Sequence, residues 1–357
     1  MARLEDFGWD EGWRPAWESL TLDGVAPARV IAVHRDALAV WTTEGERAAE
    51  VSGHLRHHST AEGDLPAVGD WVAVRLSPGE GPALVQAVLP RRTRLARKAA
   101  GTLTVEQVVA ANVDVVLVVG GLDGDYNPRR LERALVLASE GGATPAVVLN
   151  KADLLPPEEV AARVRATEEV APGVLVVPVS ASTGAGLDAI APLLRPGRTA
   201  ALLGSSGVGK STLVNRLLGE ERQRTSAVRE HDGRGRHTTS HRELLRLPSG
   251  ALIIDTPGLR ELQLWAAPEA LEGTFADLEA IAAGCRFADC GHAEEPGCAV
   301  TAAVAQGALA PARLASYHKL QRELRHLELR QDERGRSEQK QRWRAMHKAA
   351  RKHRPRE

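Results

Sequence analysis

Short runs of alternating apolar and polar residues fill the first 90 positions of the chain. The runs ARVIAVH, ALAVWTT, VGDWVAVRL and PALVQAVLP have the composition of β-strands, and polar connections such as TTEGERAAE separate them. This spacing predicts a small barrel, for which an oligonucleotide-binding (OB) barrel and a barrel with a purely structural role are the two candidates. Ahead of it, Trp9, Trp13 and Trp17 recur every four residues and predict packing against a neighbouring domain.

The pattern changes after the barrel to continuous apolar runs. These runs cover 113–120, 145–150, 174–180, 199–205 and 251–256, and helical stretches such as PRRLERALVLASE alternate with them. Buried β-type runs separated by helices predict a doubly wound α/β sheet with parallel strands. Ligands bind such sheets at the carboxyl ends of the strands, so the residues that follow each run are candidates for a site.

The sheet pattern ends near residue 265, and a helical region follows. Leu314, Tyr317, Leu320, Leu324 and Leu327 recur at steps of three and four, which predicts an amphipathic helix opened by a proline. We therefore predict three domains: residues 1–95 for the N-terminal extension and barrel, 96–265 for the sheet, and 266–357 for a small helical domain with a basic tail.

Composition adds the class of the protein. A hydrophobic content of 43% and a charged content of 26% are those of a soluble globular protein. No apolar run is long enough to span a bilayer, and the N-terminus lacks the apolar core of a signal peptide, so we expect a cytoplasmic protein without a membrane partner. A monomer is the default expectation for the oligomeric state.

Positive charge is concentrated in two places although the net charge is zero. Residues 311–357 hold 15 Lys or Arg against six Asp or Glu, and five cations fall within residues 91–98. Such blocks are often solvated surface, but two of them in one chain favour a polyanionic partner.

The segment GSSGVGKST at 204–212 fits a phosphate-binding loop that follows a strand. Its glycines allow backbone N–H groups to surround a β-phosphate, Lys210 neutralises the β- and γ-phosphate oxygens, and the Ser211 hydroxyl binds Mg²⁺. The segment DTPG follows the run that ends at Asp255, which can hold Mg²⁺ through water, and the Gly258 N–H can meet a γ-phosphate. Thr239, or its neighbour Thr238, can complete the metal shell.

The segment NKAD at 150–153 identifies the base as guanine. The Asp153 carboxylate can accept two hydrogen bonds from guanine that adenine cannot offer, while Asn150 can approach the N7/O6 edge and the Lys151 stem can pack on the ring. Ser180 and Ala181 provide backbone next to guanine O6. The predicted GTP contacts are Asn150, Lys151, Asp153, Ser180, Ala181, Gly204, Ser205, Ser206, Gly207, Val208, Gly209, Lys210, Ser211, Thr212, Thr239, Asp255 and Gly258. The predicted Mg²⁺ ligands are Ser211, Thr239 and Asp255.

The order of these motifs is a circular permutation of the usual order in guanine-nucleotide switches. The base-reading motif comes first, and the phosphate loop and the two switch segments follow it. A permuted chain can form the same sheet because each strand-end loop keeps its place.

The catalytic group is less evident than the binding site. Leu259 follows DTPG, and an apolar side chain cannot orient a water molecule. His237, next to the switch I threonines, is the candidate for that task together with Lys210 for the phosphates; the alternative is that His237 is an ordinary surface histidine.

Every cysteine of the chain lies in the segment CRFADCGHAEEPGC. Cys285, Cys290, His292 and Cys298 form a ligand set for a closed, tetrahedral structural Zn²⁺ site, and a redox role is the alternative.

Taken together, the permuted motif order, GRHTTS and CRFADCGHAEEPGC resemble the RsgA (YjeQ) family over almost the whole chain. The resemblance implies an OB-type barrel, contacts with ribosomal RNA, GTP hydrolysis stimulated by the small ribosomal subunit, and a role in late maturation of that subunit with other assembly factors as further partners. It also implies the nucleotide and zinc residues named above, with His237 in the catalytic position. The Trp-rich, mildly acidic N-terminus departs from the basic extension that the family leads us to expect. A GTP-regulated RNA- or protein-binding module with incidental hydrolysis is the alternative function.

Overall fold

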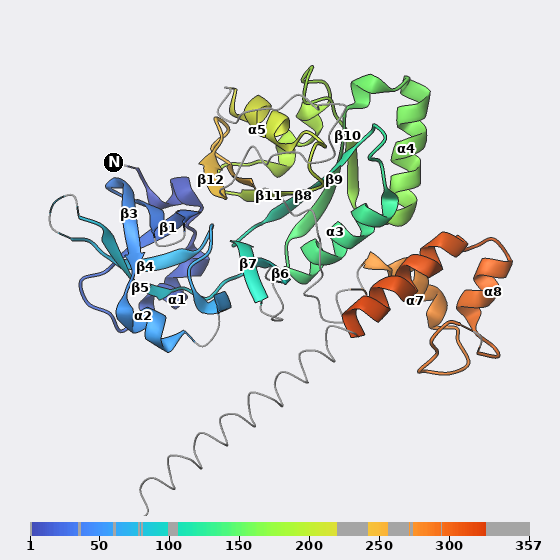
Figure 1. Cartoon of the computed structure of the whole chain (residues 1–357), viewed down its shortest axis with the longest axis horizontal. Coiled ribbons are helices and arrows are strands. Elements are labelled where there is room, and N and C mark those ends of the chain that lie inside the picture. The colour runs from blue at the N-terminus through green and yellow to red at the C-terminus, as the bar shows by residue number, and fades with distance from the viewer. Residues whose placement is uncertain are drawn as a thin grey trace, which may run out of the picture.

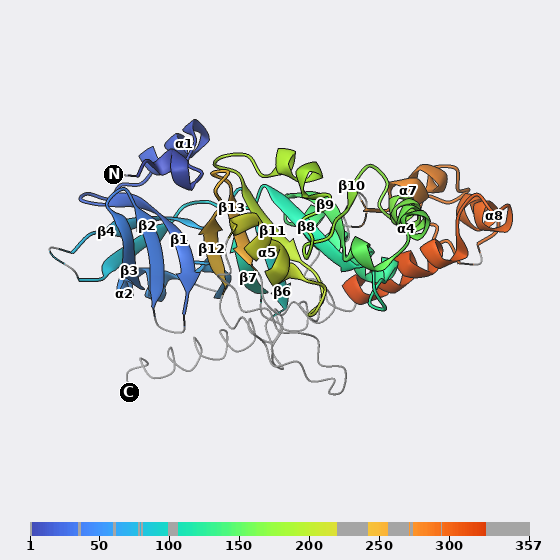
Figure 2. The ribbon, with the colours of Figure 1, turned by 90° about the horizontal axis from the view of Figure 1, so that it is seen from above.

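Three parts follow one another along the chain in this computed structural model (Figure 1). The structure describes residues 2–34, 37–59, 62–77, 79, 81–98, 106–219, 242–255, 271, 274–293 and 295–325. Blue strands of the N-terminal part lie at one end, the central sheet lies in the middle, and the orange and red helices of the C-terminal part lie at the other end (Figures 1 and 2). The two terminal parts therefore reach the central sheet from opposite sides.

Five strands of the N-terminal part close into a barrel. They are β1 (Ala26–Val33), β2 (Leu38–Thr42), β3 (Gly45–Val51), β4 (Trp71–Arg75) and β5 (Ala83–Val88). Their order is β1-β2-β3-β5-β4, and β4 pairs back with β1, which closes the barrel. The pairing of β3 with β5 is parallel and the others are antiparallel, while helix α2 (Gly53–His58) and the short turn η3 (Glu62–Asp64) connect β3 to β4. Small and branched side chains such as Val30, Val40 and Val72 fill the interior. The predicted OB-type barrel is confirmed.

Strand β3 corrects the interpretation of TTEGERAAE as a connection. Residues Gly45–Val51 pair with β2 and β5 over most of their length, although only Ala49 among them is fully buried. Glu46 and Glu50 are exposed, and Arg47, on the same face as Ala49, is only partly buried and donates to the Gly79 carbonyl. Because the barrel interior needs just one small side chain from this strand, the sequence carries no apolar alternation that reveals it.

The N-terminal extension packs against the barrel, as the tryptophan spacing predicts. It consists of the turns η1 (Leu4–Phe7) and η2 (Glu11–Trp13) and the short helix α1 (Arg14–Glu18). The Trp9 ring lies 4.8 Å from the ring of Trp71 in β4, and Trp13 and Trp17 lie 6.2 Å from Trp9. The tryptophans thus form an apolar cluster of their own beside the barrel, where aromatic burial stabilises the extension.

The central part is a six-stranded portion of the same continuous sheet. Its strands are β8 (Val115–Gly121), β9 (Thr144–Asn150), β10 (Leu175–Pro178), β11 (Thr199–Leu203), β12 (Glu243–Arg246) and β13 (Leu252–Asp255). Their order is β10-β9-β8-β11-β13-β12, with β12 alone antiparallel to its neighbour β13. The five apolar runs that predicted parallel strands correspond to β8, β9, β10, β11 and β13, so the predicted doubly wound sheet is confirmed.

Helices cover both faces of this sheet. Along β8, Val116 and Val118 point to the face covered by α3 (Pro128–Glu140) and α4 (Pro157–Val170), whereas Leu117 and Val119 point to the face covered by α5 (Lys210–Leu218). The short turns η4 (Ala152–Leu154), η5 (Leu187–Ala189) and η6 (Ala191–Leu193) connect the elements around β10. Alternate residues of one strand therefore serve two cores, which explains the continuous apolar run.

The barrel and the central sheet meet where β1 pairs with β12 in one continuous sheet. Ala32 of β1 pairs with Glu243 of β12, and the hairpin of β6 (Arg94–Lys98) and β7 (Glu106–Ala111) lies beside them. Arg29 is 2% exposed and donates to the Asn112 carbonyl and to Thr199 Oγ1, both at 3.2 Å. Burial lowers the pKa of Arg29 to about 10, so its guanidinium stays charged at neutral pH inside the junction.

The C-terminal part consists of α7 (Ala276–Ala282), α8 (Ala299–Ala305) and a helix over residues 311–325. Leu320 and Leu324 are buried and Leu314 and Tyr317 partly buried, which confirms the amphipathic helix within the described residues. Leu327 and the basic tail lie outside them. Among the described residues, no helix combines the length and apolar character needed to cross a membrane. The predicted domain limits stay predictions: residue 95 falls within β6, and residue 265 is outside the described residues.

Candidate nucleotide-binding site and metal centre

Parallel strands bring the predicted nucleotide motifs to one edge of the sheet. NKAD follows β9, the Ser180–Ala181 segment follows β10, the phosphate loop follows β11, and Asp255 ends β13. Since these strands are parallel, their carboxyl ends lie at the same edge although the motifs are far apart along the chain.

Two glycines of the phosphate loop lie where no side chain fits. Gly204 has φ +155°, and a Cβ there would lie 2.3 Å from the Val119 carbonyl oxygen. Gly209 has φ +94°, and a Cβ there would lie 2.3 Å from Asn150 Nδ2. The loop therefore fits tightly between β8 and the base-reading segment, and α5 begins directly after it at Lys210, with Ser211 and Thr212 in its first turn.

The Lys210 ammonium lies inside the curve of the phosphate loop. Its Nζ donates hydrogen bonds of 2.8 Å to the carbonyl oxygens of Gly204 and Ser205, and the residue is 9% exposed. Burial lowers the pKa of Lys210, while the carboxylates of Asp255 and Asp125 oppose that effect. A cation is thereby held at the start of α5, whose N-terminal end also favours negative charge.

Asn150 connects the base-reading segment to two other loops. Its Nδ2 donates to the Val208 carbonyl at 2.8 Å, and its Oδ1 accepts from the Ala181 N–H at 2.9 Å. The residue is 2% exposed, so both ends of its amide contribute to the architecture of the site. The sequence predicts a contact between Asn150 and the base; the structure adds this bridging role, which the motif alone does not reveal.

The other two polar residues of NKAD differ in their surroundings. Lys151 has φ +67°, and its Nζ lies 2.5 Å from Asp123 Oδ2 in the loop after β8. Asp153 is exposed, and its Oδ2 accepts from Ser182 Oγ at 3.3 Å. Hydrogen bonding, first from the Ser180 side chain and also from Ser182, lowers the pKa of Asp153, although burial opposes this effect. The carboxylate of Asp153 is therefore ionised at neutral pH and accessible to a hydrogen-bond donor.

Two residues that sequence reasoning missed complete this edge. Arg216 of α5 donates to the Ala181 carbonyl at 3.2 Å and to the Ser182 carbonyl, which fixes the loop after β10. Asp123 pairs with Lys151; burial opposes its ionisation, but the Lys151 hydrogen bond contributes to a net lowering of the Asp123 pKa. Neither residue belongs to a motif, so no local signal in the sequence identifies it.

Some of the remaining predicted GTP contacts lie in the part of the chain that the structure describes, and others lie outside it. Ser206 and Gly207 are exposed on the phosphate loop, and Val208 is buried beneath it. His237, Thr239 and Gly258 lie outside the described residues, so their predicted roles stay predictions.

The four predicted metal ligands lie together in the C-terminal part. The ligand atoms of Cys285, Cys290, His292 and Cys298 are all within 4.8 Å of one another. Burial opposes ionisation of Cys298, but hydrogen bonds, first from the Thr301 backbone N–H, outweigh it and lower the pKa of that thiol to about 6. This cluster of three thiols and one imidazole can hold a metal ion.

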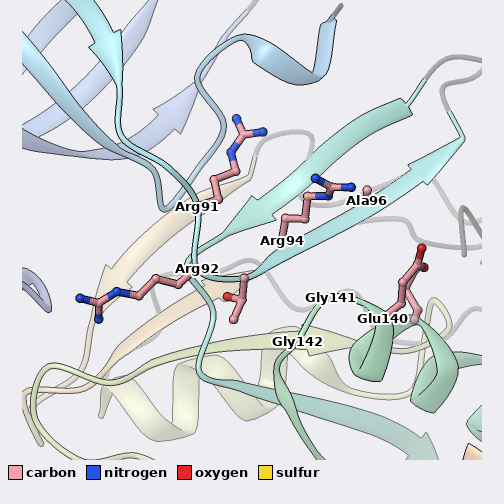
Figure 3. A pocket seen from close by; sticks show the side chains of 9 residues that line it. Arg91, Arg92, Arg94, Ala96, Glu140, Gly141 and Gly142 are labelled. Carbon is pink, nitrogen blue, oxygen red and sulfur yellow. The ribbon is translucent and has the colours of Figure 1, made fainter. Parts of the chain in front are cut away.

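The basic cluster at residues 91–98 is not the open cationic surface that its composition suggests. Arg91 forms an ion pair with buried Asp70 at 2.7 Å, and Arg92 forms one with Asp10 at 2.6 Å. The side chains of Arg91 and Arg92 point in different directions from this segment (Figure 3). Arg94 and the two arginines line a cavity of about 260 Å³ next to the end of α3. Ion pairs within the chain thus neutralise at least two of the five cations, and the predicted polyanion contact at this segment loses support.

Comparison with known proteins decides the family. The profile of the RsgA GTPase family matches residues 88–265. The small ribosomal subunit biogenesis GTPase RsgA of Opitutus terrae is 50% identical over 358 residues, which cover 98% of this chain and 97% of that protein. The chain belongs to the RsgA GTPase family.

Other RsgA proteins and solved structures agree with this assignment. The small ribosomal subunit biogenesis GTPase RsgA of Streptomyces coelicolor is 45% identical over 336 residues, covering 94% of this chain and 90% of that protein. The crystal structure of YjeQ from Thermotoga maritima has a TM-score of 0.63 at 29% identity and covers 84% of this chain and 98% of its own. YloQ, a circularly permuted GTPase, has a TM-score of 0.60 at 23% identity, covers 85% of this chain and 96% of its own, and supports the fold. The sequence-based family prediction is confirmed.

Proposed function

We propose that this RsgA-family chain is a Mg²⁺-dependent GTPase of small ribosomal subunit biogenesis whose turnover rises when it binds the subunit. The observation that carries the proposal is the assembly of the guanine-reading segment and the phosphate loop by one residue, Asn150, at the edge of a permuted sheet. The names of its relatives, small ribosomal subunit biogenesis GTPases, support the biological setting and a cytoplasmic location.

Guanine selection follows from the state of Asp153. An ionised, exposed carboxylate accepts the N1–H and N2–H of guanine, and a base without these donors leaves it without partners. The Ala181 N–H is oriented by Asn150, and Arg216 holds the carbonyl of the same residue. The base pocket is therefore fixed before a nucleotide arrives, which lowers the entropic cost of binding.

The phosphate side of the site is built for a triphosphate with Mg²⁺. Lys210 and the backbone N–H groups of the loop bind phosphate oxygens, and Ser211 and Asp255 are the described residues that would hold Mg²⁺ directly or through water. Bound Mg²⁺ neutralises charge on the phosphates. Thr239 as a third ligand and His237 as the group that orients water belong to the same proposal.

We assign Zn²⁺ to the Cys/His cluster as a structural metal. Tetrahedral zinc with Zn–S of about 2.3 Å and Zn–N of about 2.1 Å requires S···S of about 3.8 Å and S···N of about 3.6 Å. The Cys285 and Cys298 sulfurs are 3.9 Å apart, and His292 Nδ1 is 3.6 Å from each of them. All four positions are protein ligands, which leaves no place for a catalytic water.

Phosphate release from GTP, measured with and without purified small subunits at low and high salt, tests the proposal. We expect stimulation of at least ~100-fold that weakens with salt, because subunit binding involves RNA phosphates. Normal GTP binding without stimulation at any salt would instead favour a GTP-regulated binding module.

A further inference from the structure

Arg130 of α3 contacts the phosphate loop although it belongs to no nucleotide motif. Its Nη1 donates to Ser205 Oγ at 2.7 Å and to Asp125 Oδ1 at 2.6 Å. Ser205 is the second residue of the loop, and its carbonyl accepts a hydrogen bond from Lys210. One guanidinium group therefore holds both the loop and a carboxylate beside it.

The position of Arg130 in its helix is unfavourable for a cation. Asn127 caps α3 by accepting from the N–H groups of Arg129 and Arg130, and Pro128 is the first helical residue, so Arg130 lies in the first turn. The positive end of the helix dipole favours acidic residues there, and this turn contains none. Local helix stability does not account for an arginine at this position.

The Asp125 carboxylate explains on electrostatic grounds why a cation is needed at position 130. Asp125 accepts from the same Arg130 nitrogen that donates to Ser205 of the phosphate loop, so its carboxylate lies beside the loop where phosphates bind. An uncompensated anion at that place repels a nucleotide, and the repulsion grows with the charge of the phosphates. Arg130 cancels this charge while it fixes Ser205.

Helix α3 is itself held from its other side by the C-terminal part. Glu132, two residues further along and therefore on the opposite side of the helix, accepts from Arg313 at 2.6 Å and from Ser316. Arg133 pairs with Glu323 at 2.7 Å. The helix that carries Arg130 is thus clamped between the phosphate loop and the helix over residues 311–325, next to which Figure 1 shows it.

We propose that Arg130 is a positioning residue of the GTPase: it holds the phosphate loop through Ser205 and neutralises Asp125, and so determines affinity for the triphosphate. This inference rests on the proposed function of the same site.

Binding of fluorescent GTP and GDP to the full-length protein tests the inference. We expect Arg130→Ala to weaken GTP binding about tenfold and GDP binding less, because GTP carries more negative charge. Asp125→Asn in the same chain should restore most of the lost GTP affinity. Arg130→Lys should recover only part of it, because the lysine side chain is one bond shorter and its ammonium group does not reach both oxygens from the same helix position. Arg129→Ala, an exposed neighbour in the same turn, is the matched control and should bind as wild type.

Three results would overturn the inference. Arg130→Ala could bind GTP with wild-type affinity, or it could lose GTP and GDP affinity equally without rescue by Asp125→Asn. Arg129→Ala could also lose as much GTP affinity as Arg130→Ala. If Arg130→Ala does not fold, Arg130→Gln decides in its place, since it removes the positive charge and keeps a polar side chain: GTP affinity identical to wild type would overturn the inference. A wild-type protein that binds no guanine nucleotide would refute the proposed function itself.

Discussion

Replacement of Arg313 by methionine should detach the C-terminal part from the central sheet. Arg313 is buried, with 4% of its side chain exposed, and so is Glu132 with 2%. The guanidinium donates to Glu132 at 2.6 Å, to Asp277 at 2.9 Å and to the Thr274 carbonyl at 2.6 Å. Its carbon Cζ also lies 4.2 Å from the centre of the Phe275 ring.

The expected cost follows from the carboxylate that the variant leaves behind. Removal of one partner of a buried ion pair typically costs about 3–5 kcal/mol, because the other charge stays buried without compensation. That loss is a large fraction of the ~5–15 kcal/mol that stabilises an ordinary domain. Methionine keeps an unbranched apolar chain but ends short of the guanidinium position, so some lost packing adds to this figure.

The assay is urea unfolding followed by circular dichroism, together with limited proteolysis between the central and C-terminal parts. Arg133→Ala is the control, since its pair with Glu323 is 25% and 36% exposed and should contribute at most about 1 kcal/mol. Glu132→Gln added to Arg313→Met should recover part of the loss because a neutral amide is less costly to bury. The reasoning fails if Arg313→Met is no less stable than Arg133→Ala, or if Glu132→Gln recovers nothing.

Single substitutions in the nucleotide site and in the Cys/His metal site should impair different properties, namely nucleotide binding and turnover in the first and zinc binding and folding in the second. Lys210→Ala should weaken GTP binding and slow phosphate release at least ~100-fold in a nucleotide titration and a turnover assay, and near-normal turnover would argue against its phosphate contact. Asn150→Ala should weaken GTP and GDP equally, by about tenfold or more, because it releases the loops at Val208 and Ala181; a loss confined to GTP would contradict the bridging role. Cys290→Ser should lose zinc in a colorimetric metal assay and unfold the C-terminal part while basal GTP hydrolysis persists, whereas retained zinc would refute the ligand set.

The sequence predicts the central sheet well because that sheet is buried on both faces. Continuous apolar runs mark β8, β9 and β11, and nucleotide motifs directly follow β9 and β11. The Cys/His metal site can also be recognised from the sequence, since its four ligands lie within a short segment of chain.

Long-range polar contacts are what the sequence does not reveal. Arg130 and Ser205 are 75 residues apart, and Arg313 and Glu132 are 181 apart, so no periodicity connects them. The ion pairs of Arg91 and Arg92 likewise join distant segments, so composition alone does not reveal them. Strand β3 escaped notice for a different reason, because Glu46 and Glu50 lie on its exposed face and its single buried residue is an alanine.

The most direct test of the central account exchanges the base that the site recognises. In Asp153→Asn the new amide N–H can donate to the 2-oxo group of xanthine, whereas the carboxylate accepts from the amino group of guanine. GTP turnover should therefore fall and XTP turnover should rise. Turnover of both nucleotides is measured for wild type and variant, with and without small ribosomal subunits. We predict that the subunit stimulates GTP hydrolysis by the wild type and XTP hydrolysis by the variant. Undiminished, subunit-stimulated GTP hydrolysis in Asp153→Asn would contradict the account, because the guanine-reading residue would then not control the ribosome-dependent reaction.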